Sequence, residues 1–345
     1  MINKKTKKAF SLLEVIFVLV ILGIVASISS QIIVQVYENY IIQKAVYNVS
    51  TKTEVAANQI VNRLTYRIPG TTISKDHDAF VAGLATPIEG THWRKLQDVV
   101  TGGNTYTTIE WIGYDNDSFA AKQTPGWSGI ADYEAPNTNK GQFLTPGSNL
   151  STTATIVSNL SKNEVGTGVK QVELTTAKPA AVIFSQKDNW YKKDTQYNPI
   201  CMGLIPHGRT SDTPAILSST ECIFSVAQKT GSSNILEFVS NAPDTSATDP
   251  KIISERYKLA WSAYAIAPIP NMETGLHDLV LYSNYQPWNG ESYLDTTTTQ
   301  NTILKNISVF KFSENGGTVQ FKLCAVEKIS KDVNVTTCKE KVVIR

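Results

Sequence analysis

The chain has 345 residues, of which 41% are hydrophobic, and its formal net charge at pH 7 is +2. A chain of this length and composition can bury one or two hydrophobic cores, so the totals exclude general disorder. The near-neutral charge argues against a general nucleic-acid-binding protein, because the domains of such proteins are usually clearly basic.

Positive charge is concentrated at the N-terminus. The first nine residues contain Lys4, Lys5, Lys7 and Lys8 and no acid, so removing them takes +4 from +2 and leaves a net charge of −2. Because the cytoplasmic flanks of membrane segments are rich in lysine and arginine, we expect this tip to remain in the cytoplasm.

An apolar segment follows at residues 10–36, and its single charged residue is Glu14. A helix needs about 20 apolar residues to cross the hydrocarbon core of a bilayer, so this segment is long enough to span it. The sequence therefore predicts one membrane crossing, with the rest of the chain on the far side.

A cleaved secretory signal peptide is the alternative interpretation of this segment. Small residues at 26–30 could supply its cleavage site. However, the apolar run is longer than a typical signal core. An ionised carboxylate such as that of Glu14 also costs a few kcal/mol in lipid, and a disposable signal has no use for one.

Glu14 is the fifth residue counted from Phe10. Cleavage between Ala9 and Phe10 would create a new α-amino group near the membrane surface. The Glu14 carboxylate could pair with that amine in a neighbouring subunit, so that each buried charge meets its opposite.

Residues 7–15, continuing through Gly23, closely resemble the prepilin-type cleavage and methylation motif of type IV pilins and type II secretion pseudopilins. The resemblance implies cleavage after Ala9 by a prepilin peptidase, N-methylation of Phe10, and a need for Glu14 in ordered assembly. It implies a single-pass protein of the bacterial inner membrane with a periplasmic head, which joins a fibre through contacts of its N-terminal helix with other pilins or pseudopilins.

Two positions depart from the pattern of these families. The residue before the cut is usually Gly and is Ala9 here, and Gln31 stands where major pilins usually carry Pro. The second departure indicates a minor rather than a major subunit.

The predicted helix continues beyond the membrane segment as far as Pro69-Gly70, because proline disfavours helix at the residue before it. Over residues 37–68 apolar residues recur at steps of three and four, which marks one face for burial. This pattern fits a pilin stem packed on its own head, and an ordinary amphipathic helix would show it too. The face consists of Tyr37, Tyr40, Ile41, Ala57, Ile60, Val61, Leu64 and Ile68.

The remaining residues, 69–345, form the expected exported head. Short runs that alternate apolar and polar residues, separated by turn residues, are typical of half-buried antiparallel strands. With the N-terminal helix they predict an α+β, pilin-like fold, in which 314–317 turn a hairpin and 138–162 form an exposed loop. The expected strands are 106–114, 171–174, 181–184, 235–239, 257–267, 279–285, 307–312, 319–326 and 341–344.

The four cysteines fall as two local pairs, Cys201 with Cys222 and Cys324 with Cys338. In an exported protein an even number of cysteines indicates disulfides, although four allow three connectivities. No pair has C-x-x-C spacing, so a zinc or redox site is not favoured.

The head also bears a diffuse resemblance to J-type minor pseudopilins and related minor pilins, over residues 57–68, 257–266, 275–285 with Trp288, and 303–312. The resemblance leaves residues 83–234 unexplained. It implies a subunit that sits with other minor subunits at the fibre tip and primes assembly.

Residues with catalytic or metal-binding chemistry are sparse. His77, His92, His207 and His277 lack metal-ligand spacing, so positions on the surface or in loops are expected for them. The G-x-S-x-G pattern that begins at Gly126 fails at Ile130, which favours a turn exposing Trp127. We therefore expect no cofactor and no catalytic site.

Two acidic turns are weak calcium candidates, Asp115 with Asp117 and Asp76 with Asp78. Solvated Asx-turns are the simpler interpretation. Trp127, Trp190 and Trp288 could form a contact surface, but packing inside the head is favoured.

Three classes of function remain. The first is a non-enzymatic minor pilin or pseudopilin, which accounts for Glu14. The second is an adhesin or other binding module on a pilin stem, for which the net negative charge of the mature chain disfavours DNA. The third, an N-anchored periplasmic enzyme, lacks a catalytic cluster and gives Glu14 no purpose.

Overall fold

The computed structural model describes residues 11–84, 87–99, 107–119, 125–139, 141–165, 168–184, 199, 202–205, 222–240, 254–330 and 333–344. The chain forms two compact units. The first runs to Lys52 and includes 326–337, and the second comprises 53–325 with 338–345.

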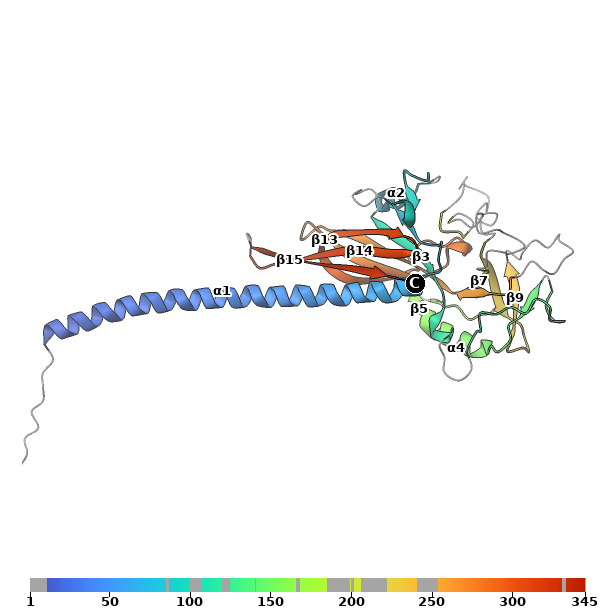
Figure 1. Ribbon diagram of the computed structural model, residues 1–345, viewed down its shortest axis with the longest axis horizontal. Helices are drawn as coiled ribbons and strands as arrows, with labels where there is room; N and C mark the ends of the chain where they lie inside the picture. The colour runs from blue at the N-terminus through green and yellow to red at the C-terminus, as the bar shows by residue number, and fades with distance from the viewer. Residues whose placement is uncertain are drawn as a thin grey trace, which may run out of the picture. The chain divides into compact units, whose positions relative to one another are not determined.

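The first long element is α1, Leu12–Thr65, an unbroken helix of 54 residues (Figure 1, blue). Its first half is the apolar segment, whose large side chains are exposed, and α1 is the one helix among the described residues long and apolar enough to cross a membrane. Two backbone bonds tighten its last turn, from Tyr66 N to Arg63 O (3.3 Å) and from Arg67 N to Leu64 O (3.2 Å). The predicted long helix is confirmed, with its end three residues earlier than expected.

The predicted apolar face of α1 is confirmed only in its last turns. Ala57, Ile60 and Leu64 are at most 1% exposed, because they occupy one stripe of the helix at steps of three and four. Tyr37 and Tyr40, assigned to the same face, are 64% and 59% exposed in the single protomer, so their predicted burial is wrong.

An eight-stranded sheet has the strand order β15-β14-β13-β12-β11-β3-β1-β2 (Figure 1). From β2 to β14, each strand in this order pairs with its neighbour in the antiparallel direction. Its strands are β1 Ile73–Lys75, β2 Trp93–Lys95, β3 Thr108–Gly113, β11 Ser262–Asn271, β12 Leu276–Tyr285, β13 Thr299–Asn315, β14 Thr318–Lys328 and β15 Asn334–Val343.

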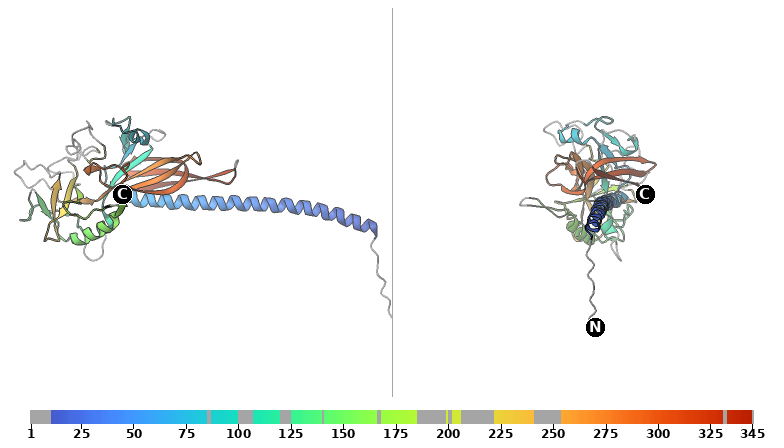
Figure 2. Two further views of the ribbon diagram at one scale, coloured as in Figure 1. Left: turned by 180° about the vertical axis from the view of Figure 1, so that it is seen from behind. Right: turned by 90° about the vertical axis from the view of Figure 1, so that its left-hand side faces the viewer.

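A five-stranded sheet has the order β10-β7-β8-β9-β4, and β5 Asn163–Val165 pairs separately with β6 Gly168–Lys170. The strands of the five-stranded sheet are coloured from green to orange in Figure 2. The five strands are β4 Gln142–Leu144, β7 Ala180–Phe184, β8 Phe224–Gln228, β9 Ile235–Ser240 and β10 Tyr257–Ala260.

Strand β7 is buried on both faces. Ala181 and Ile183 pack in a core with residues of β11 and β12, whereas Val182 and Phe184 pack in a second core with residues of α4, Leu150–Ser161. Alternate side chains of a strand point to opposite faces, so a strand between two cores must be apolar at every position. This explains the continuous apolar run of β7.

Helix α4 contradicts the exposed loop predicted for 138–162. Asn149 caps it by accepting a hydrogen bond from Thr152 N (3.4 Å), and Leu150, Thr153, Val157 and Ser161 are buried at helical spacing. The sequence did not reveal this buried stripe, because threonine and serine occupy two of its four positions. The other short helices are α2 His77–Val81, η1 Leu96–Asp98, α3 Asn116–Phe119 and η4 Pro287–Asn289.

Two strand predictions are also wrong. Residues 257–267 form two strands in different sheets, β10 and β11, separated at Trp261, and residues 171–174 form no strand. The hairpin is confirmed: Asn315 pairs with Thr318, and Gly316 and Gly317 between them have positive φ (57° and 80°), which a two-residue turn of this kind requires.

Candidate functional site

The N-terminal segment is described from Ser11 onward. The four leader lysines, Ala9 and Phe10 therefore lie outside the described residues, and the predicted cleavage remains a prediction.

Ser11 and Glu14 cap the start of α1 reciprocally. Leu13 N donates to Ser11 Oγ (3.2 Å), and Ser11 N donates to Glu14 Oε2 (3.2 Å). This is a capping box, in which two N–H groups that lack intrahelical partners are satisfied by side chains. The cap was not predicted above, where only the charge of Glu14 was used, although the Ser-x-x-Glu spacing of residues 11–14 is typical of a capping box.

The surroundings of Glu14 are apolar and open in the single protomer. Leu13 and Phe17 are 77% and 66% exposed. The carboxylate thus stands among side chains that favour lipid or protein over water, and a hydrogen bond to one N–H group balances little of its charge.

Residues 4–30 match the model of the prokaryotic N-terminal methylation motif. The chain carries the N-terminal motif of prepilin-type precursors. Neither a curated protein nor a solved structure matches the chain. The methylation motif supports a pilin- or pseudopilin-type precursor with a membrane-anchoring helix, whereas its head must be interpreted from its own residues.

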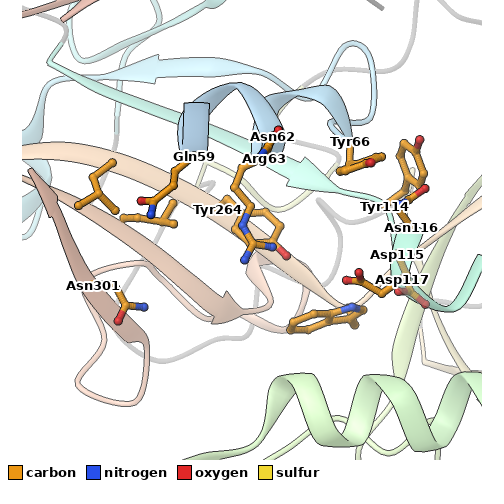
Figure 3. A pocket seen from close by; sticks show the side chains of 13 residues that line it. Gln59, Asn62, Arg63, Tyr66, Tyr114, Asp115, Asn116, Asp117, Tyr264 and Asn301 are labelled. Carbon is orange, nitrogen blue, oxygen red and sulfur yellow. The ribbon is translucent and has the colours of Figure 1, made fainter. Parts of the chain in front are cut away.

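The head of the chain contains a cavity of about 420 Å³ beside the last turns of α1 (Figure 3). All of its lining residues belong to the second unit. They are Gln59, Asn62, Arg63, Tyr66, Tyr114, Asp115, Asn116, Asp117, Trp261, Tyr264, Leu281, Asn301 and Ile303.

The ring of Tyr264 is held in this cavity by neighbours on both sides. It stacks on Trp111 with 5.8 Å between ring centroids, and the guanidinium carbon of Arg63 lies 5.4 Å from its centroid. A Cβ atom at Gly113 would lie only 2.6 Å from Tyr264 Cε2, so glycine there permits the close approach of the ring.

Asp115 and Asp117, the weak calcium candidates, both line the cavity but differ in environment. Asp115 is 2% exposed and accepts hydrogen bonds from the backbone and hydroxyl of Ser118, whereas Asp117 is exposed. Burial raises the pKa of Asp115 to about 7. Within the described residues no three His, Cys, Asp or Glu side chains gather as a metal-binding group.

The second acidic turn is also used as a helix cap. Asp76 accepts hydrogen bonds from Asp78 N (3.2 Å) and Ala79 N (3.4 Å) at the start of α2. His77 is buried, with Nδ1 3.3 Å from Tyr293 Oη, so the surface position expected for it is wrong. His92 is half-buried and His277 is exposed, and His207 lies outside the described residues.

A buried ion pair between Lys75 of β1 and Glu110 of β3 was not predicted. The two side chains are 4% and 1% exposed. Lys75 Nζ also donates to Leu204 O (2.7 Å), and Tyr285 Oη donates to Glu110 Oε1 (2.8 Å). The residues are far apart in the sequence, so only the pairing of the strands reveals them.

Cys324 and Cys338 form a disulfide between β14 and β15, which is the local pairing expected for them. Cys222 is disulfide-bonded, and Cys201 lies outside the described residues.

Trp127 and Trp288 are fully buried, which agrees with packing inside the head. The turn expected to expose Trp127 is therefore wrong, because the indole packs among the buried residues of the second core and donates to Asp115 O (2.9 Å). Trp190 lies outside the described residues.

Proposed function

We propose that this precursor matures into a non-enzymatic structural subunit of a type II secretion pseudopilus or of a type IV pilus or competence fibre. In this proposal it is a minor subunit near the tip that primes assembly. The observation that carries it is Glu14, the single acid of the apolar segment, placed within a methylation motif.

The physical argument concerns the cost of that acid. Cleavage between Ala9 and Phe10 gives the mature chain a cationic α-amino group four residues before Glu14. In the single protomer the carboxylate accepts the Ser11 N–H through Oε2. In the fibre it also meets the amine of an adjacent protomer, and this opposite charge offsets the cost of removing both groups from water.

The charge distribution supports the orientation of the subunit. The leader lysines stay in the cytoplasm by the positive-inside rule, α1 crosses the inner membrane, and the head enters the periplasm. Disulfide bonding in the head fits this oxidising compartment. Gln31, in place of the proline of major pilins, favours the minor role.

Three variants separate the charge of Glu14 from its capping role. Glu14→Gln keeps an oxygen that can accept the Ser11 N–H but removes the charge, Glu14→Ala removes both, and Ser11→Ala removes the hydroxyl while keeping the carboxylate. We expect both Glu14 variants to fall at least tenfold in sheared fibres while remaining in the membrane fraction. Ser11→Ala should be incorporated within about twofold of the wild type. Immunoblots of the two fractions measure this.

Mass spectrometry of the N-terminal peptide is the processing control for each variant, and we expect the mature chain to begin at N-methylated Phe10. Normal incorporation of Glu14→Gln beside loss of Glu14→Ala would show that the cap, rather than the charge, is required. A native chain that begins at Met1 or near Ser30 would contradict the proposal altogether.

A further inference from the structure

The proposed assembly role rests on the N-terminal half of α1, whereas the cavity is lined by residues of the second unit alone. Its lining comes from the C-terminal end of α1, the segment after β3, Trp261 between β10 and β11, and strands β11, β12 and β13 (Figure 3). Its volume of about 420 Å³ lies within the range of small-molecule sites.

Four aromatic side chains line this cavity. Tyr66 is 37% exposed and meets Tyr114 edge to face, with 5.7 Å between ring centroids. The ring of Tyr264 is covered by Trp111 and Arg63, and Trp261 is buried, so Tyr66 offers the most exposed ring. Because Tyr114 holds the Tyr66 ring in place, a ligand that packs on this ring loses little entropy on its account.

Four amide side chains supply groups that both donate and accept hydrogen bonds. Gln59, Asn62 and Asn301 are exposed and Asn116 is half-buried. In the described part of the chain, none of these amides is committed to a protein partner. An amide can therefore meet a group that, like a hydroxyl, is at once donor and acceptor.

The charges that line the cavity nearly cancel. Arg63 contributes one positive charge and Asp117 one negative charge, and the oxygens of Asp115 already accept hydrogen bonds from Ser118. This balance disfavours phosphates, nucleic acids and strongly charged ligands, which require an excess of one sign.

We infer that this cavity binds an uncharged saccharide, of which one C–H face packs on the exposed ring of Tyr66 and the hydroxyls pair with the amides of Gln59, Asn62, Asn116 and Asn301. This inference does not rest on the assembly role, because a single protomer contains the whole site. The same chemistry could come from cell-wall glycan or from an oligosaccharide outside the cell.

The test uses the full chain in detergent micelles. Binding is measured to chitobiose and to maltose by calorimetry, to isolated peptidoglycan sacculi by co-sedimentation, and to an array of neutral oligosaccharides. We expect at least one of these to bind. Retention on sacculi together with chitobiose identifies the cell-wall source, and retention on the array alone identifies the external source.

Matched variants show whether binding occurs in the cavity. Asn62→Ala and Tyr66→Ala should each weaken binding at least tenfold. Asn58→Ala lies one turn away on the same exposed side of α1, and Tyr133→Ala removes a tyrosine of similar exposure (39%), so both controls should bind as the wild type does. Melting temperatures verify folding.

Two results would overturn the inference. One is no binding of any neutral saccharide at millimolar concentration. The other is binding that Asn62→Ala and Tyr66→Ala leave unchanged. Loss of fibre incorporation by Tyr66→Ala, without saccharide binding by the wild type, would assign the cavity to a protein contact instead.

Discussion

Asp115 shows how a single residue couples the head to pH. Its carboxyl group caps α3 through Ser118 N (3.3 Å), which favours the charged form. Burial acts in the opposite direction and dominates, so the pKa rises from 3.8 to about 7. The nearby Asp117 carboxylate raises it further.

This shift predicts that the head loses stability as the pH rises from about 4 to about 7. In that range the folded protein holds a proton on Asp115 that the unfolded chain has released. The free energy of unfolding should therefore fall by up to about 1.4 kcal/mol per pH unit on account of this group. Asp115→Asn should remove that component. Denaturant unfolding of the full chain in micelles at pH 5, 6 and 7 measures both slopes.

The exposed neighbour gives the control for this titration. Asp117→Asn should retain most of the wild-type slope, because burial is the main cause of the shift at Asp115. Equal slopes in the wild type and in Asp115→Asn would show that the carboxyl of Asp115 titrates normally.

Residues differ in how far the sequence reveals them. Glu14 is found at once because a charge in an apolar run is costly. Ser11 forms a local Ser-x-x-Glu cap and was open to prediction. The role of Arg67 could not be predicted from the sequence. Its guanidinium donates to Leu64 O (2.9 Å) and to the backbone oxygen of the hairpin residue Gly317, which is remote in sequence.

At the scale of elements, the pairing of β1 with β3 brings Lys75 and Glu110 together inside the head. A buried ion pair adds little net stability, because desolvation offsets the attraction. Removing one partner is costly, since it leaves an uncompensated charge among apolar groups.

We therefore predict that Lys75→Met and Glu110→Gln each lower the free energy of unfolding by about 3–5 kcal/mol. The double variant should lose clearly less than the sum of the two, because neither charge remains. Urea unfolding followed by tryptophan fluorescence measures all three variants.

The half-exposed pair Lys178–Glu173 is the matched control, with side chains 39% and 38% exposed. Lys178→Met should cost at most about 1 kcal/mol, because solvent screens an exposed pair. Strictly additive losses in the Lys75 and Glu110 variants would show that the two buried groups do not interact.

Elements follow the same division between local and tertiary causes. Helix α1 was predictable because its long apolar run contains no breaker, and the β13–β14 hairpin because of Gly316-Gly317. The division of 257–271 between two sheets could not be predicted in the same way. Both strands are rich in apolar residues, and the break between them depends on how the sheets pack at Trp261. The cavity was missed for a similar reason, because separate segments build it.

At the scale of the whole molecule, the charge is asymmetric, because positive charge is concentrated at the N-terminus. The four leader lysines carry +4, and the remaining chain carries −2. Each lysine near an anionic leaflet contributes roughly 1 kcal/mol to its retention on that side. The leader can thus orient a chain whose head lacks a comparable positive cluster in its sequence.

This asymmetry predicts the orientation of the precursor and how to disturb it. In spheroplasts, added protease should digest the wild-type head, as followed with an antibody to a C-terminal tag. Replacing Lys4, Lys5, Lys7 and Lys8 with Gln should lower the digested fraction several-fold, because the positive flank no longer holds the N-terminus inside. Lys305→Gln with Lys311→Gln, changed in the head, should leave it unaltered. A wild-type head protected from the protease would refute export, and unchanged digestion of the leader variant would show that the lysines do not set the orientation.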